Sequence, residues 1–289
     1  MGFGADARSG DDAEGTTGSF DDLLGYVESS LSFATSSYNR AYLDRRISAR
    51  MRRRRVEDYD EYRALLRDDD EEQEALLNAL SVNVTSFFRN PEVWEGLREV
   101  LAGLDGRRRT RVWSAACSDG REAYSVAMLA LDDDRIDADR VEILGTDIKP
   151  EILRAARQGE YHASETNDLE SQLDPLAGSG RYVTREDETF RVTDEAREMV
   201  TFREHDLVQE EPPRTFDLVI CRNLFIYINT EAKQAIFETL GSGVRPGGYL
   251  TIGMTETVPR SVRERYDPVD KRLRIYRDTT GDGDAGRRR

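Results

Sequence analysis

Apolar residues recur at helical spacing in the first third of the chain, among many charged positions. The clearest stripes are Leu23, Leu24, Val27 and Leu31 near its start, and Leu76, Leu77, Leu80 and Val82 near its end. Spacings of three and four residues place such side chains on one face of a helix. The pattern therefore predicts a small all-helical domain over residues 19–82.

Beyond this region, continuous apolar runs alternate with helically spaced segments as far as Tyr276. The runs begin near Arg111, Val141, Thr215 and Arg245. Strands that alternate with helices favour an α/β fold with a mostly parallel sheet. Residues 1–18 and 279–289 are instead rich in glycine and aspartate, and we expect both ends to be disordered tails.

The stretch from Arg111 to Asp147 predicts the first half of a nucleoside-binding unit. A buried strand enters a loop of small residues at 115–120, a helix follows over 121–131, and a second strand ends in Asp147. An acid at that place accepts hydrogen bonds from a ribose. The loop offers only Gly120, whereas a pyrophosphate-binding fingerprint needs three glycines. A nucleoside without phosphates, such as S-adenosylmethionine, fits better, although a structural βαβ unit without ligand has the same pattern.

Later strand ends add polar residues to the same predicted edge of the sheet. The third apolar run leads into Cys221-Arg222-Asn223, and Tyr227 lies four residues beyond the asparagine. Open α/β sheets bind their ligands outside the carboxyl ends of the strands. Gly120, Asp147 and the Arg-Asn pair all fall at such ends, so we expect them to meet in one crevice.

Four ordered motifs are shared with a known family. They are Asn83-Val84-Thr85-Ser86-Phe87-Phe88-Arg89, Trp113-Ser114-Ala115-Ala116, Cys221-Arg222-Asn223 with Ile226-Tyr227, and Pro246-Gly247-Gly248-Tyr249-Leu250. In these motifs the chain resembles the chemotaxis receptor methyltransferases (CheR type), which esterify receptor glutamates with S-adenosylmethionine and release S-adenosyl-L-homocysteine. The resemblance runs from about Phe20 to Arg277. It implies a Rossmann-like methyltransferase sheet over 83–278, with a small antiparallel β subdomain near 180–204.

The resemblance also implies a set of site residues. Those that would contact the cofactor are Asn83, Thr85, Arg89, Gly120, Glu122, Asp147, Asp206, Leu207, Arg222 and Asn223. Arg89 and Tyr227 match the family's pair nearest the transferring methyl and are the expected catalytic residues. Outside the motif, Arg89 could equally cap a helix end, and Tyr227 could be a core aromatic with an exposed tip.

The chain departs from the family's pattern in places. Asp119-Gly120-Arg121-Glu122-Ala123 stands where Thr-Gly-Glu-Glu-Pro is usual, Asp206 where Asn is usual, and Met254-Thr255-Glu256 where His-Ser-Glu is usual. Asp119 and Arg121 can compensate each other in charge. The two methyl-proximal positions do not depart.

Glutamate methylation requires few chemical groups. A sulfonium is an activated methyl donor and a carboxylate is a nucleophile at neutral pH, so neither a general base nor a metal is required. The enzyme has to align the reacting atoms and exclude water. A guanidinium can hold a carboxylate through two parallel hydrogen bonds, a role that suits Arg89 or Arg222. His162 and His205 lie too far apart in sequence to suggest a metal pair, and structural roles are favoured for both.

Composition limits the partners and the cellular location to be expected. The net charge of −15 argues against general nucleic-acid binding. No apolar run approaches the roughly 20 residues of a membrane span, and residues 1–18 lack the features of a signal peptide. We therefore expect a cytoplasmic protein without membrane insertion.

Lysine is scarce in this acidic chain and is confined to Lys149, Lys233 and Lys271. An acidic composition with little lysine is typical of halophilic proteins, although an ordinary acidic protein from a GC-rich genome is the alternative.

A basic helix is expected to contact the receptor. Its apolar stripe is Leu43, Ile47 and Met51, which should pack inward. Arg46, Arg50 and Arg53 then line one flank of that stripe. In an acidic chain such a face would steer receptor glutamates and hold them in register, although a solvated face is the alternative. We expect a monomer whose partner is the cytoplasmic domain of a chemotaxis receptor.

Other functions require other features. A nucleic-acid methyltransferase would need a basic face near the cofactor, for which the arginines at 45–55 are the only candidate. A regulatory module that only binds S-adenosylmethionine could lack Arg89 or Tyr227, and a small-molecule enzyme would need no basic helical domain. Some family members grip a receptor's C-terminal peptide with a longer, glycine-rich loop than the one at 184–189. We expect receptor methylation without that tether.

Overall fold

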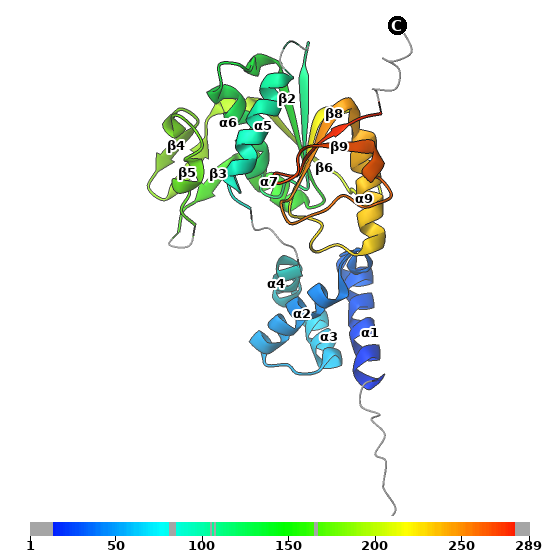
Figure 1. Ribbon diagram of the computed structural model, residues 1–289. Coiled ribbons are helices and arrows are strands. Elements are labelled where there is room, and N and C mark those ends of the chain that lie inside the picture. The colour runs from blue at the N-terminus through cyan, green and yellow to red at the C-terminus, as the bar shows by residue number, and fades with distance from the viewer. Residues whose placement is uncertain (1–13, 81–84, 105, 107, 165–166, 281–289) are drawn as a thin grey trace, which may run out of the picture. The chain divides into compact units, whose positions relative to one another are not determined.

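The computed structural model describes residues 14–80, 85–104, 106, 108–164 and 167–280. The chain divides into two compact units. The helical unit is Met1–Val82 with Tyr227–Asn229, and the second unit is Asn83–Ile226 with Thr230–Arg289. Figure 1 colours most of the first unit blue to cyan and the second from cyan to red.

Within its described residues, the helical unit contains α1 (Glu14–Leu31), the 3-10 turn η1 (Thr35–Ser37), α2 (Arg40–Arg54), α3 (Tyr59–Asp68) and α4 (Asp70–Leu80). The side chain of Asn39 begins α2 by accepting a hydrogen bond from the Ala41 amide at 3.0 Å. α1 starts inside the region predicted to be a tail. In the second predicted tail, residues 279–280 are described, and the Thr279 amide donates to the Arg265 carbonyl at 2.9 Å. Residues 1–13 and 281–289 lie outside the described residues.

The core of the helical unit confirms the predicted apolar stripes. Leu43, Ile47 and Met51 of α2 are at most 4% exposed. They share one cluster with Leu23, Val27, Leu76 and Leu80, against which Leu24, Leu31 and Leu77 pack. Val82 lies outside the described residues. The small all-helical domain is therefore present as the spacing predicted.

The second unit is built on a seven-stranded sheet of described residues, in the order β6-β2-β1-β7-β8-β10-β9. Its strands are β1 (Thr110–Ala115), β2 (Val141–Asp147), β6 (Val200–Glu204), β7 (Phe216–Cys221), β8 (Val244–Ile252), β9 (Tyr266–Asp270) and β10 (Ile275–Asp278). The five strands from β6 to β8 pair in parallel, whereas β10 and β9 run antiparallel at one edge. The α/β fold predicted from the alternating pattern is confirmed.

Helices and short turns connect these strands. The helices are α5 (Pro91–Gly103), α6 (Arg121–Asp132), α7 (Pro150–Gln158), α8 (Asp194–Glu198) and α9 (Thr230–Gly243), and the 3-10 turns are η2 (Ala138–Arg140), η3 (Ser171–Leu173), η4 (Ser179–Arg181) and η5 (Arg263–Arg265). The chain passes from β1 through α6 to β2, and later reaches β7 on the other side of β1. Such a switch point is where open α/β sheets bind ligands. None of the helices that the structure describes is long and apolar enough to cross a lipid bilayer.

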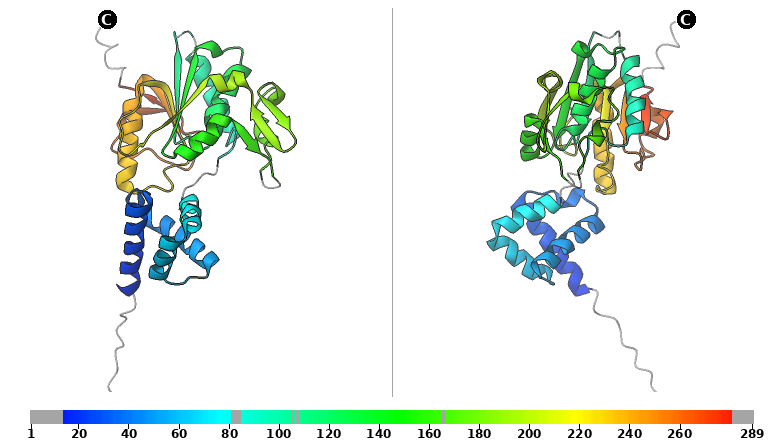
Figure 2. Two further views of the ribbon diagram at one scale, coloured as in Figure 1. Left: turned by 180° about the vertical axis from the view of Figure 1, so that it is seen from behind. Right: turned by 90° about the vertical axis from the view of Figure 1, so that its left-hand side faces the viewer.

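A second, antiparallel sheet has the order β3-β5-β4, with β3 (Glu160–His162), β4 (Val183–Glu186) and β5 (Thr189–Val192). The predicted small subdomain is present, but its predicted bounds of 180–204 are wrong at both ends. β3 lies earlier in the chain, and β6 pairs with β2 in the main sheet, where Phe202 packs against Gly120 and Gly145. The small sheet lies on the side of this unit away from α9 (Figures 1 and 2).

Candidate functional site

The loop after β1 folds back over the end of β2. The Cys117 amide donates a hydrogen bond to the Thr146 carbonyl at 2.8 Å. Ala116 and Ser118 both adopt a positive φ, at 55° and 53°. Such a backbone is costly for residues with a Cβ, and large or branched side chains rarely adopt it. The small residues of this loop suit its path over β2.

Gly120 ends this loop and begins α6. Its φ is +86°, and a Cβ at this position would lie 2.7 Å from Phe202 Cζ and 2.9 Å from Ala156 Cβ. Both the backbone conformation and the close packing demand glycine. The residue is therefore explained without any contact to a phosphate, in agreement with a nucleoside that carries none.

Asp147 lies at the end of β2, beside the loop. Its carboxylate accepts hydrogen bonds from the Ser118 amide at 2.9 Å and the Lys149 amide at 3.2 Å. Burial raises the pKa of Asp147, and these backbone bonds oppose the rise. The next residue, Ile148, exposes 49% of its surface. A fixed acid beside exposed apolar surface suits a ribose with its base.

Glu122, in the first turn of α6, faces Arg222 at the end of β7. Ser114 Oγ donates a hydrogen bond to Glu122 at 2.8 Å, and Arg222 Nη1 lies 3.7 Å from a Glu122 oxygen. Burial raises the pKa of Glu122 against the opposing effect of Arg222. Burial also lowers the pKa of the Arg222 guanidinium. The two residues form a loosely joined ion pair next to the switch point, in which the Arg222 side chain is 1% exposed and that of Glu122 is 12% exposed.

Arg222 also holds the loop that carries Arg89. Its Nη2 donates to the Arg89 carbonyl at 2.8 Å and to Asn90 Oδ1 at 2.9 Å. Trp94 Nε1 donates to the same Arg89 carbonyl at 3.1 Å. The structure therefore brings Arg89 and Arg222 together through the backbone of Arg89.

Two side chains that sequence reasoning missed fix the same loop. The Phe87 amide donates to Gln172 Oε1 at 3.0 Å, and the Phe88 amide donates to Ser125 Oγ at 3.0 Å. Phe88 has a φ of 44°, which is unusual for a bulky residue and persists only where its surroundings hold it. These partners lie 85 and 37 residues apart along the chain, so no local pattern could reveal them.

Glu256 is a further residue that was not predicted as part of the site. It is 3% exposed and accepts hydrogen bonds from the amides of Asn223 at 3.1 Å, Phe225 at 2.8 Å and Gly253 at 2.6 Å. Burial raises the pKa of Glu256, and the three amides oppose the rise. One carboxylate thus fixes the turn after β7. The sequence feature that could have identified Glu256 is its place only four residues beyond the end of the apolar strand β8.

Asp206 and Leu207 follow β6 at the same edge of the sheet. Leu207 is buried, and the Asp206 carboxylate accepts hydrogen bonds from two amides of the turn that follows it, at 2.7 and 3.2 Å. The amide of the preceding residue, His205, donates to the Asp147 carbonyl at 3.1 Å, and its ring packs edge-on against Trp113. The predicted structural role of His205 agrees with these contacts.

The remaining predicted residues divide between the two units. Thr85 is half-buried in the second unit, and Asn83 lies outside the described residues. Tyr227 belongs to the helical unit, where its ring centroid lies 5.0 Å from that of Tyr42 in α2. The two predicted catalytic residues, Arg89 and Tyr227, therefore come from different units.

The three arginines predicted to dock the receptor differ in their surroundings. Arg53 is exposed, and the Arg46 guanidinium lies 5.5 Å from the centre of the Tyr42 ring. Arg50 instead pairs with the buried Glu72, with Nε–Oε1 at 3.0 Å and Nη2–Oε2 at 2.5 Å, and its side chain is 16% exposed. The predicted role of Arg50 is corrected, because its guanidinium is engaged inside the helical unit.

Two buried polar atoms beside this edge have no hydrogen-bond partner within the part of the chain that the structure describes. They are Ser118 Oγ and Arg222 Nε. Buried polar groups are normally paired with protein, water or ligand. A hydroxyl next to Asp147 and a guanidinium donor next to Glu122 fit a ligand with ribose hydroxyls and a carboxylate, as S-adenosylmethionine has.

Two protein-family models match the chain. The CheR methyltransferase all-alpha domain matches residues 18–81, and the CheR methyltransferase SAM binding domain matches residues 83–275. The chemotaxis protein methyltransferase of Listeria monocytogenes is 33% identical over 235 residues, which cover 80% of this chain and 87% of that protein. That of Salmonella typhimurium is 30% identical over 236 residues, which cover 79% and 80%. A solved structure of the glycopeptide N-methyltransferase MtfA, at 12% identity and a TM-score of 0.37 over 60% of this chain and 50% of that one, is too distant to add to the assignment.

Proposed function

This chain belongs to the CheR methyltransferase family, and we propose that it transfers methyl groups from S-adenosylmethionine to glutamate side chains of chemotaxis receptors. The observation that carries the proposal is that both domain models of this family match in order over residues 18–275. The chain is accordingly a methyltransferase that uses S-adenosylmethionine. The identity of the methylated group as a glutamate carboxylate is the proposed part.

The proposed step is a displacement at the methyl carbon. A carboxylate oxygen of the receptor glutamate forms a bond to this carbon as the carbon–sulfur bond breaks, and the bonding electrons stay on sulfur. When bound, S-adenosylmethionine supplies a methyl group that its sulfonium charge already activates. No proton moves, so the protein has to bind, orient and exclude water rather than act as a base.

We assign cofactor binding to the carboxyl ends of β1, β2 and β7. Asp147 would accept hydrogen bonds from the ribose hydroxyls, and Ile148 offers apolar surface to the base. Ser118 Oγ and Arg222 Nε would bind polar groups of the ligand. A cationic group placed beside Glu122 would favour its charged form and oppose the effect of burial on its pKa. The assignment also retains, on the resemblance alone, Asn83, Thr85, Asp206, Leu207 and Asn223.

We assign the methyl-proximal roles to Arg89 and Tyr227. Hydrogen bonds from Arg222 and Trp94 to the Arg89 carbonyl constrain the backbone from which its guanidinium extends. That guanidinium would hold the substrate carboxylate through two parallel hydrogen bonds. The Tyr227 hydroxyl would orient the same carboxylate or the methyl group. Both roles act in the transition state and should affect turnover more than cofactor affinity.

We propose that exposed arginines of α2 contact the receptor. From the predicted set, Arg53 is exposed and Arg46 is half-buried beside the Tyr42 ring, and further exposed arginines of this helix and its end include Arg45, Arg52 and Arg55. The chain as a whole carries a net charge of −15. A local positive face would attract receptor helices that present glutamates, and salt would weaken the attraction.

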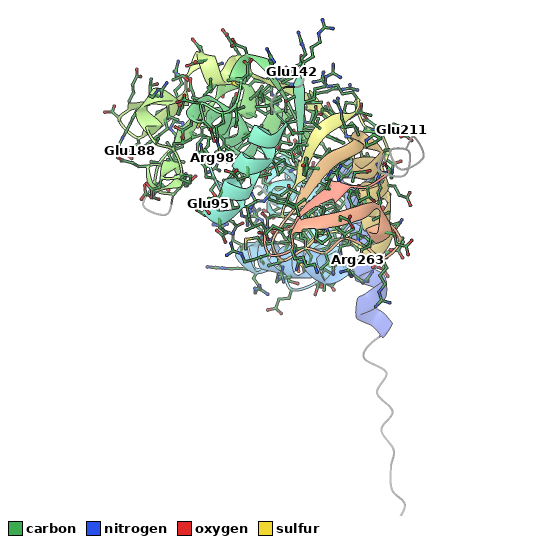
Figure 3. All side chains as sticks on the ribbon, turned by 45° about the horizontal axis from the view of Figure 1, so that its top comes forward. Glu95, Arg98, Glu142, Glu188, Glu211 and Arg263 are labelled. Carbon is green, nitrogen blue, oxygen red and sulfur yellow. The ribbon has the colours of Figure 1, made fainter. Side chains whose placement is uncertain are left out.

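We also propose that methylation does not depend on a receptor's C-terminal peptide. The turn between β4 and β5 is limited to Asp187 and Glu188, because Glu186 already pairs with Thr189; the label of Glu188 marks this turn in Figure 3. An added strand needs an accessible and uncluttered edge. Deleting the receptor's C-terminal tail should leave methylation intact, and abolished methylation would contradict the proposal.

The function is tested by incubating the full chain with methyl-labelled S-adenosylmethionine and a receptor cytoplasmic fragment. Carboxyl methyl esters release methanol in base, whereas N-methyl products do not. We expect label on the receptor that base converts to methanol. Base-stable label would identify a different nucleophile. Cofactor binding without any label on the receptor would favour a regulatory module.

A further inference from the structure

The segment Tyr227–Asn229 lies among residues of the helical unit. Tyr38 and Ile228 form an antiparallel bridge. The Asn39 amide donates to the Tyr227 carbonyl at 2.8 Å, and the Asn229 amide donates to the Ser37 carbonyl at 3.0 Å. The backbone on both sides of Ile228 is therefore fixed by the residues that precede α2.

Tyr42, in the first turn of α2, holds the side chain of Tyr227. The two ring centroids are 5.0 Å apart, and the rings are tilted by 53°. Tyr42 is 4% exposed, and its hydroxyl donates to the Leu80 carbonyl at 2.7 Å, which ties the ring to α4. Aromatic pairs at such separations contribute roughly 1 kcal/mol beyond their buried area and favour particular ring orientations.

We infer that Tyr42 is a positioning residue for Tyr227, so that the helical unit helps to set the rate of methyl transfer in addition to its proposed contact with the receptor. The inference rests on the proposed role of Tyr227. A small tilt of the Tyr227 ring displaces the hydroxyl at its far end, and a displacement of about 1 Å can lower a rate by about 100-fold. The start of α2 fixes both the backbone and the side chain of Tyr227, since the Asn39 amide binds the Tyr227 carbonyl and Tyr42 packs against the Tyr227 ring.

A core role for Tyr42 would predict different kinetics. Tyr42 belongs to the core of the helical unit, so removing its ring will also destabilise that unit. A loss of packing alone lowers the fraction of folded enzyme, and removing another aromatic ring from the same unit should have the same kind of effect. A positioning role lowers kcat of the folded enzyme and leaves cofactor affinity unchanged.

The test compares Tyr42→Leu with Tyr42→Phe and with Tyr26→Leu in the full chain. Tyr26 is the control, because it is a half-buried tyrosine on α1 that packs against the same core, and its hydroxyl approaches the Leu66 carbonyl at 3.5 Å. We expect Tyr42→Leu to lower kcat about tenfold with an unchanged Kd for S-adenosylmethionine, because the ring that orients Tyr227 is lost. Tyr42→Phe keeps the ring and should restore most of kcat. Tyr26→Leu should leave kcat of the folded fraction unchanged.

A coupling measurement links the effect to Tyr227. If Tyr42 acts through Tyr227, then Tyr42→Leu should lower kcat much less in a Tyr227→Phe background than in the native chain. Additive losses, equal losses in Tyr42→Leu and Tyr26→Leu, or an unchanged kcat in Tyr42→Leu would each overturn the inference. Methyl ester formation by the native chain in the same assay tests the proposed function separately, because it depends on none of these variants.

Discussion

Each unit holds a glutamate beside an arginine, and the two pairs are built differently. In the helical unit, Arg50 approaches Glu72 through contacts of 3.0 and 2.5 Å, and the Tyr62 hydroxyl donates a third hydrogen bond at 2.6 Å. In the second unit, Arg222 stays 3.7 Å from Glu122, and its Nε has no partner among the residues that the structure describes. We call the Arg50–Glu72 network closed, because Arg50 and Tyr62 both hydrogen-bond the Glu72 carboxylate. We call the Arg222–Glu122 pair open, because Arg222 Nε is a buried donor with no partner among the described residues.

The pKa values of the two glutamates move in opposite directions. Burial by itself raises the pKa of each carboxyl. For Glu72, the bonds from Arg50 and Tyr62 outweigh burial and lower its pKa, whereas for Glu122 burial dominates and its pKa is raised. A buried network that satisfies all its members fixes a fold, while one that leaves a member unsatisfied is costly unless a ligand completes it. We therefore propose that the first pair serves stability and the second serves cofactor binding.

Glu72→Gln should have the largest effect on stability of the changes considered. It removes the negative partner of Arg50, and breaking a buried pair from one side costs about 3 kcal/mol. Urea unfolding followed by circular dichroism, with hydrogen exchange of α2 and α4, measures the loss. Glu71→Gln is the matched control, because Glu71 is the exposed neighbour in the same helical turn. Equal stability in the two variants would remove the assigned role of the closed network.

The same variant carries a pH signature. A carboxylate whose folded pKa lies below its unfolded value of about 4.3 contributes stability above that pH, and the contribution is lost as pH falls through the folded pKa. Glu72 is such a group. The difference in unfolding free energy between the native chain and Glu72→Gln should therefore shrink on acidification below about pH 4. A difference that stays constant to lower pH would show that charge is not its cause.

Asp147→Ala and Arg89→Ala should separate binding from turnover in the second unit. Asp147→Ala removes ribose hydrogen bonds that are used equally in the ground and transition states, so cofactor affinity should fall about tenfold, or about 1.4 kcal/mol. Arg89→Ala, and likewise Tyr227→Phe, should lower kcat more than affinity. Titration calorimetry beside initial rates provides both quantities. Equal losses of affinity in all three variants would contradict the assigned roles.

How much of the fold and of the site could be predicted from the sequence depends on how far apart in the chain the interacting residues lie. The helix that begins at Arg121 and the strand that ends at Asp147 follow from neighbouring residues, and the structure has both there. Arg50 was assigned to a docking face because periodicity tells which side of α2 it occupies, but not that Glu72, 22 residues later, meets it. The subdomain bounds of 180–204 that the resemblance implied include β6, and only its pairing with β2, more than 50 residues earlier in the chain, places it in the main sheet.

Reversing the charge of Arg46 and Arg53 while keeping Arg50 should separate the arginines of α2 that contact the receptor from the one that pairs with Glu72. The double change to Glu should raise KM for the receptor about fivefold at low salt, because steering is lost while the closed network remains. Cofactor affinity should not change, and urea unfolding measures any loss of stability from Arg46, whose guanidinium lies 5.5 Å from the centre of the Tyr42 ring. Arg260→Glu with Arg263→Glu is the control of equal charge on exposed residues of the second unit, where Figure 3 labels Arg263. Identical kinetics in the two double variants would place receptor docking elsewhere.

Salt should have the smallest effect of those considered. Screening relieves self-repulsion in a chain of net charge −15, so Tm should rise by about 2–4 °C between low and molar potassium chloride. The rise would agree with the halophilic interpretation of an acidic, lysine-poor chain. A Tm that does not change over this range would speak against that interpretation and leave the comparison of the two glutamates intact.

Titration of S-adenosylmethionine into Glu122→Gln and Glu72→Gln tests the central claim most directly. At neutral pH and under conditions where both variants are folded, Glu122→Gln should weaken cofactor binding about tenfold and should destabilise the fold less than Glu72→Gln does, because Glu122 stays 3.7 Å from Arg222. Glu72→Gln should bind the cofactor as the native chain does, despite its lower stability. Native-like affinity in Glu122→Gln, or a comparable loss of affinity in Glu72→Gln, would contradict the assignment of the open pair to the cofactor.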